Sequence, residues 1–133
     1  MRLAGAVLLA GAVLAAGGGC RGRDDPEAAV EALIAAARAG DRAAVYERFG
    51  ARTRARIDGL LASAQRTGGT RTLRPEDLVT VGWLPPAWEP AGTRLLRREG
   101  TEAEVEVFSG TGDRQAIRTV LEGKTWKVEL PFR

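Results

Sequence analysis

The sequence predicts an α+β domain, with helices in the first half of the folded chain and antiparallel strands in the second half. Apolar residues recur at helical spacing through residues 26–65. They alternate with charged residues through residues 102–108 and 125–130, as in half-buried strands. A proline-rich segment, residues 79–92, separates the two patterns. Because the helices precede the strands, we expect them to pack on one face of an antiparallel sheet.

The first predicted helix begins at Pro26. Asp25 is a favourable N-cap residue, proline suits the first helical position, and Glu27 complements the positive end of the helix dipole. Gly40 ends this helix. The residues between place one apolar stripe along it, made of Val30, Leu33, Ile34 and Ala37.

Two further helices are predicted before the proline-rich segment. Asp41 caps the second, over residues 42–49, and the third covers residues 52–65 after Gly50. A short helical turn is predicted at residues 75–78. The third helix carries its own apolar stripe, made of Ile57, Leu60, Leu61 and Ala64.

Prolines in residues 79–92 exclude a central strand there, so this segment is predicted to be an extended connector. Glycine-containing turns then separate four predicted strands, at residues 93–99, 102–108, 115–122 and 125–130. The second strand places its three glutamates on one face, where they can pair with arginines and lysines of neighbouring strands.

The N-terminus has the pattern of a secretory signal peptide. Arg2 precedes the apolar residues 3–16, which span about 21 Å as a helix and fall short of the ~30 Å hydrocarbon core. Glycines follow, and then Cys20, the only cysteine. Gly18, Gly19 and Cys20 resemble the lipobox of bacterial lipoproteins, although Gly17 stands where that motif usually has leucine.

This resemblance implies cleavage before Cys20 and acylation of its sulfur, with palmitate among the attached chains. It divides the chain into a signal peptide (residues 1–19), a short lipidated tether (residues 20–25) and a single α+β domain (residues 26–133). The alternatives are an ordinary secreted protein with one free thiol and a cytoplasmic protein with an apolar start. Removal of 19 of the 133 residues leaves 114, enough for one domain with its own core.

Composition excludes several function classes. The chain has no histidine, so it cannot form a Ser-His-Asp or Cys-His nucleophile or a histidine-ligated zinc site. Cys20 has no partner for an internal disulfide. A net charge of only +3 does not indicate nucleic-acid binding. We therefore predict no metal, no cofactor and no nucleic-acid partner.

Two segments resemble the nuclear-transport-factor-2-like superfamily, in which helices form a cone on a curved antiparallel sheet. Residues 35–49 resemble its first helix, Gly-Asp turn and second helix ending in an aromatic residue. Residues 120–130 resemble its closing hairpin, where a glycine turn precedes tryptophan and an alternating strand. The resemblance implies a curved sheet with a pocket inside the cone.

Members of this superfamily include isomerases, dehydratases and epoxide hydrolases that use Asp, Tyr and His in that pocket. Tyr46 is the only tyrosine. The residues expected to line a pocket are aromatic: Tyr46, Trp83, Trp88 and Trp126. Each of them also has a structural interpretation, as a core or lid residue. The carboxylates available to work with Tyr46 are Asp41, Asp58, Asp77, Glu89 and Asp113.

The missing catalytic side chains favour a protein without enzymatic activity. The sequence predicts a cell-envelope protein, anchored in the membrane through Cys20 on its exported face. Its cone pocket or sheet face would bind an envelope protein or a small apolar ligand. The alternatives are an envelope enzyme that pairs a pocket carboxylate with Tyr46, and a structural adaptor of an envelope complex. No catalytic residue is assigned.

Overall fold

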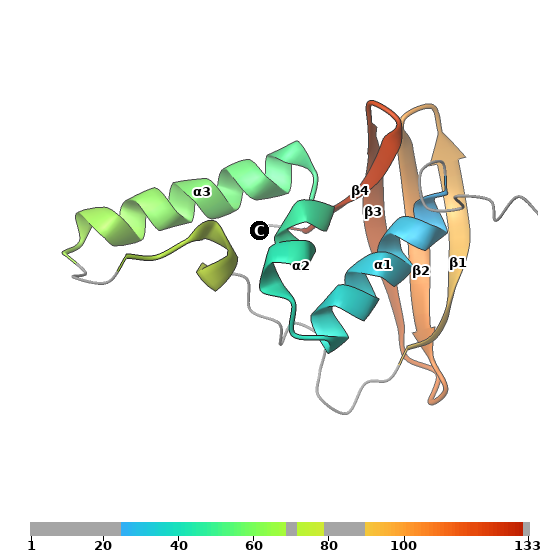
Figure 1. The fold of residues 1–133 in the computed structure, drawn as a ribbon. Coiled ribbons are helices and arrows are strands. Elements are labelled where there is room, and N and C mark those ends of the chain that lie inside the picture. The colour runs from blue at the N-terminus through green and yellow to red at the C-terminus, as the bar shows by residue number, and fades with distance from the viewer. Residues whose placement is uncertain (1–24, 69–71, 79–89, 132–133) are drawn as a thin grey trace, which may run out of the picture.

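The computed structural model describes residues 25–68, 72–78 and 90–131 and shows an α+β fold, as predicted (Figure 1). Its elements are α1 (Pro26–Arg38), α2 (Arg42–Arg48), α3 (Ala51–Arg66), the 3₁₀ helix η1 (Pro75–Leu78), β1 (Pro90–Glu99), β2 (Glu102–Ser109), β3 (Arg114–Glu122) and β4 (Thr125–Glu129). The predicted signal peptide, Cys20, Trp83, Trp88 and Glu89 lie outside the described residues. None of the helices within the described ranges is long and apolar enough to cross a membrane.

The four strands form one antiparallel sheet in the order β1-β2-β3-β4. Each strand pairs with its neighbour in sequence. Short turns connect these strands, as antiparallel pairing allows. In this register Val105 of β2 lies between Leu95 of β1 and Ile117 of β3. These residues share the face of the sheet that α1 covers.

The hydrophobic core lies between this face and α1, which contacts all four strands. Val30 and Leu33 of α1 are fully buried against valines of the sheet, including Val105 and Val128. The predicted caps are confirmed. The Asp25 Oδ1 atom accepts the Glu27 N–H at 2.9 Å, and the Asp41 Oδ1 atom accepts the Ala44 N–H at 3.0 Å.

The predicted connector of residues 79–92 is partly wrong, because its last three residues belong to β1. Pro90 pairs with Ser109 and Gly92 with Phe108, with a register irregularity between the two pairs. Proline is tolerated here because Pro90 is the first residue of β1, and β1 is an edge strand. Residues 79–89 lie outside the described part of the chain.

Helix α3 departs from the prediction that the helices pack on the sheet. It extends away from the sheet, on the side opposite β1, and contacts η1 (Figure 1). Only its Thr53 and Ile57 are buried. Leu60, predicted to belong to a core-facing stripe, is 49% exposed.

The start of α3 is held by two glutamates from the sheet. The N-cap residue, Gly50, has no side chain with which to cap the helix. Instead, the Glu122 Oε2 atom accepts the Ala51 N–H at 2.6 Å, and the Glu129 Oε2 atom accepts the Thr53 N–H at 2.9 Å and also the Thr53 hydroxyl. Glu129 is only 6% exposed. Its carboxylate thus satisfies helix N-terminal donors that lack partners within the helix.

Candidate binding face

The face of the sheet opposite α1 carries mostly charged side chains. The register places Arg94 beside Glu106, and it places Glu104 between Arg97 and Arg118. In β2 the glutamates alternate with the buried residues Ala103, Val105 and Val107. We call this surface the charged face and define it as Arg94, Arg97, Glu102, Glu104, Glu106, Arg114 and Arg118.

Ion pairs cross the charged face, which confirms the predicted pairing of the β2 glutamates with arginines of neighbouring strands. The Glu106 Oε1 atom lies 2.8 Å from Arg94 Nη2 and 3.4 Å from Arg114 Nη1. Arg118 pairs with Glu102. Exposed pairs of this kind contribute about 0–1 kcal/mol each to stability. These pairs therefore add little to the stability of the sheet.

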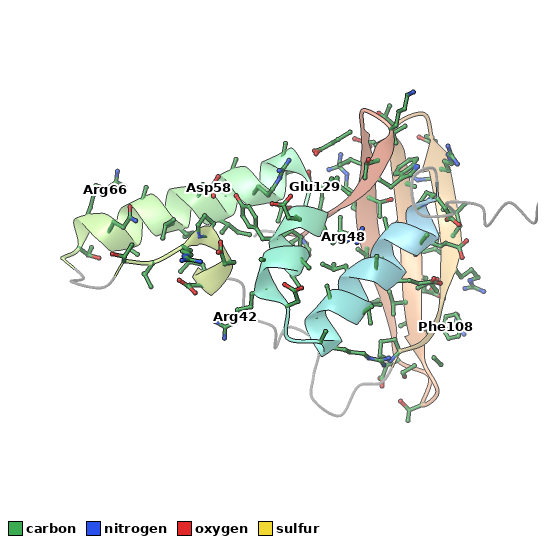
Figure 2. All side chains as sticks on the ribbon, in the orientation of Figure 1. Arg42, Arg48, Asp58, Arg66, Phe108 and Glu129 are labelled. Atoms are coloured by element: carbon green, nitrogen blue, oxygen red, sulfur yellow. The ribbon has the colours of Figure 1, made fainter. Side chains whose placement is uncertain are left out.

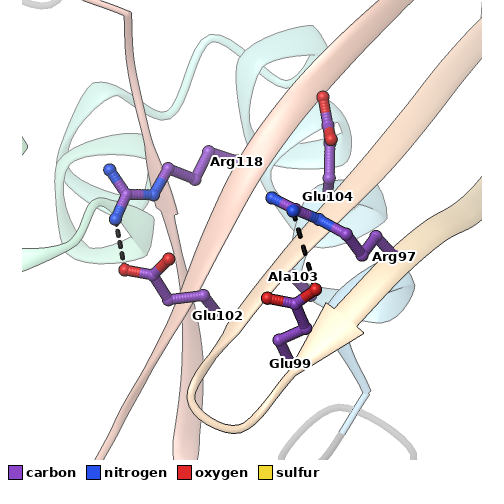
Figure 3. Close-up of a pocket in the computed structure, with 6 residues that line it drawn as sticks. All are labelled: Arg97, Glu99, Glu102, Ala103, Glu104 and Arg118. Atoms are coloured by element: carbon purple, nitrogen blue, oxygen red, sulfur yellow. Dashed lines mark hydrogen bonds and ion pairs between the residues drawn. The ribbon is translucent and has the colours of Figure 1, made fainter.

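One hollow in the charged face contains charges of both signs (Figure 3). It encloses about 170 Å³. Arg118 and Glu102 pair on one side of it, and Arg97 and Glu99 pair on the other at 3.6 Å. Glu104 lies between the two arginines in the register. A second hollow of about 270 Å³ reaches from Glu104 and Arg118 to the first turn of α3.

A third hollow combines charge with an aromatic ring. It encloses about 300 Å³ beside Phe108, with Arg94, Glu106 and Arg114 around it. Phe108 points away from the helices (Figure 2) and lies over Gly92, where an added Cβ would come within 2.7 Å of the ring. Two guanidinium groups share one carboxylate here, so the hollow keeps one positive charge. It can accept a small anion attached to an apolar group.

The predicted pocket residues Tyr46 and Trp126 line none of these three hollows. Trp126 is 2% exposed and packs with Ala29 and Ala103, and the Arg98 guanidinium lies 5.1 Å from its ring centroid. Tyr46 packs against the core from α2, where it is half-buried. The other two predicted pocket residues, Trp83 and Trp88, lie outside the described residues.

Most of the candidate carboxylates have local structural contacts. Asp41 caps α2, Asp77 accepts the Arg74 N–H at 2.9 Å, and Asp113 accepts the Thr111 hydroxyl at 2.9 Å within a turn. Asp58 differs from them because its Oδ1 atom accepts the Tyr46 hydroxyl at 2.8 Å, which links α2 to α3.

The environment of Tyr46 keeps its phenol protonated. Partial burial of the ring and the hydrogen bond to the Asp58 carboxylate raise the pKa of the Tyr46 hydroxyl above 10.0. At neutral pH the hydroxyl is therefore a hydrogen-bond donor. The pair connects the two helices at an exposed position.

Replacing Tyr46 by phenylalanine is expected to lower the free energy of unfolding by about 0.5–1 kcal/mol, because the exposed hydrogen bond to Asp58 is lost. Since the folded pKa is raised, the hydroxyl's contribution is fully present below pH 10.0 and disappears as the pH rises through the folded value. Urea unfolding of both proteins at neutral and strongly alkaline pH measures the difference. A difference that grew with pH would contradict this assignment.

Phe108 and the arginines around it were not among the predicted site residues. The alternation of β2 predicted a glutamate face, but the hollow depends on the pairing of β2 with the proline-containing strand β1.

The described residues contain no group of three or more Cys, Asp or Glu side chains able to hold a metal ion. The chain matches no known protein family, no curated protein and no solved structure.

Proposed function

We propose that this is a lipid-anchored protein of the bacterial cell envelope, without enzymatic activity, which binds a ligand or protein partner through its charged face. The sequence supports the anchor, because an apolar leader and three glycines precede Cys20. The structure adds that the folded domain begins almost at once, since Asp25 already caps α1. The five residues after Cys20, 21–25, span at most about 18 Å, so the anchor would hold the domain at the membrane surface.

We also propose that the α+β fold is a nuclear-transport-factor-2-like cone. Two features of the fold support this assignment. A Gly40-Asp41 turn joins α1 to a short α2 that ends before Phe49, and Gly123 lies in the closing hairpin between β3 and β4. The extended position of α3 distinguishes this chain from a closed cone.

The observation that carries the binding proposal is the arrangement of Arg94, Glu106 and Arg114 beside Phe108. A net positive charge next to an apolar ring favours a partner in which an anionic group adjoins an apolar one. A free small molecule and a side chain of an envelope protein can both supply this chemistry. The experiments below distinguish these two sources.

The anchor is tested by replacing Cys20 with serine in the full chain. We expect the wild-type protein to incorporate a palmitate analogue and to partition with membranes. The Cys20→Ser variant should incorporate none and keep its signal peptide, because cleavage at a lipobox requires the cysteine. A variant that is still cleaved and labelled would refute lipidation at this residue.

The binding face is tested with the double variant Arg94→Ala/Arg114→Ala. Native mass spectrometry of the protein extracted from membranes detects a small ligand, and photo-cross-linking from position 111 detects a protein partner. We expect the bound species to be lost in the double variant, whose exposed ion pairs contribute little to stability. Arg66→Ala, at the far end of α3, is the matched control (Figure 2). Binding that survives the double replacement, or no bound species in either assay, would contradict the proposal.

A further inference from the structure

The edge strand β1 exposes two adjoining leucines. Leu95 is 37% exposed and Leu96 is 44% exposed. A single exposed leucine is ordinary on a protein surface. A register irregularity between Leu95 and Arg97 interrupts the alternation of β1 at this point, so the two leucines adjoin at the edge between Arg94 and Arg97, and we call them the ridge.

This ridge lies beside the point where the chain would leave for its anchor. The Glu27 Oε1 atom, in the first turn of α1, accepts the Leu95 N–H at 3.2 Å. One turn further along α1, the Glu31 Oε1 atom accepts the Thr93 hydroxyl at 2.8 Å. Figure 1 shows the N-terminal end of α1 next to β1, whereas α3 extends on the opposite side of the molecule.

We propose that the β1 edge rests on the lipid bilayer, with Leu95 and Leu96 at the boundary between headgroups and acyl chains. This inference rests on the proposed lipid anchor and adds an orientation to it. The tether from Cys20 reaches at most about 18 Å, so the side of the domain near Asp25 must face the membrane. The ridge belongs to that side, and α3 points away from it.

The contacts along the edge favour a bilayer over a second copy of the chain. A partner strand would need the Leu95 N–H, which is already bonded to Glu27. An antiparallel copy would also bring the arginines of the two edges together. Those arginines have contacts of their own, since Arg94 pairs with Glu106, Arg97 pairs with Glu99 and Arg98 lies over Trp126. The two leucines supply the apolar part of this contact, and the acyl chains on Cys20 hold the domain at the surface without a need for anionic lipid.

A fluorophore on the ridge tests this orientation. Acylation blocks the Cys20 sulfur, so a Leu96→Cys variant of the full chain carries one reactive thiol. It is labelled with an environment-sensitive dye and placed in vesicles of equal phosphatidylethanolamine and phosphatidylglycerol, with or without a nitroxide-bearing lipid. Leu60→Cys on α3 is the matched control, because Leu60 is as exposed but lies on the helix that points away. Leu95→Cys gives a second reading from the ridge.

We expect blue-shifted emission and strong nitroxide quenching at positions 95 and 96, little quenching at position 60, and no loss of quenching at high salt. Equal or absent quenching at position 96 in acylated protein would overturn the orientation and leave the anchor intact. A blue shift without nitroxide quenching would indicate pairing with a second copy and would also overturn it. Absence of an acyl group on Cys20, measured by mass spectrometry, would overturn both proposals.

Discussion

Replacing Glu129 by alanine is expected to lower the free energy of unfolding by about 1–3 kcal/mol. The carboxylate is 6% exposed and accepts both the N–H and the hydroxyl of Thr53. Its removal leaves these two donors without their partner in a buried place, which costs about 1–3 kcal/mol. The same bonds cap α3, so the loss of the cap is included in this figure.

Urea unfolding followed by circular dichroism measures this change. Glu129→Gln keeps the length of the side chain and one acceptor oxygen, so we expect about half the loss. Glu122→Ala is the second comparison, because Glu122 caps Ala51 from a more exposed position. We expect it to cost about 1 kcal/mol. A Glu129→Ala protein no less stable than the Glu122→Ala protein would show that the buried carboxylate does not hold α3.

Replacing Gly50 by alanine is expected to lower the free energy of unfolding by about 2 kcal/mol. Like the replacement of Glu129, this change disturbs the Glu129 carboxylate. A Cβ at Gly50 would collide with Glu129 Oε1 and would stand 2.6 Å from its Cδ. The backbone at Gly50 has φ −70°, which alanine adopts freely. The cost therefore comes from moving the Glu129 carboxylate away from Thr53.

A double-mutant cycle separates this explanation from a general effect of the added methyl group. In a Glu129→Ala background the obstacle is gone, so Gly50→Ala should cost much less, with a coupling energy of about 1–2 kcal/mol. Gly59→Ala in the middle of α3 is the control. A Cβ there meets nothing within 4 Å, and the replacement should stabilise the helix by about 0.5–1 kcal/mol. Additive effects of Gly50→Ala and Glu129→Ala would rule out the collision.

The elements of this fold could be predicted because their signals are local. Asp25, Pro26 and Gly40 mark the ends of α1, and the alternation of charged and apolar residues marks β2 and β4. The role of Glu129 is not local. Alternation predicts that Glu129 lies on the polar side of β4 together with Lys127. Glu129 is buried on that side only because α3 packs against it, and its partner Thr53 is 76 residues away in sequence.

The candidate site was harder to predict for a related reason. Its charges follow from the β2 alternation, but Phe108 became part of a hollow only through its pairing with Gly92, inside a proline-containing segment that was predicted to be a connector. Trp126 was a reasonable choice for a pocket by residue type. Its position opposite Leu121 in the register places it on the core side of the sheet.

The capping of α3 by Glu122 and Glu129 also bears on how this helix forms. The first turn of any helix is its nucleus, which is unfavourable because several residues are fixed for one hydrogen bond. Here the sheet supplies acceptors for that first turn, because Glu122 of β3 and Glu129 of β4 accept its N–H groups. The turns beyond Ile57, with little buried surface of their own, then only need to elongate. The first turn of α3 thus depends on a hairpin far along the chain.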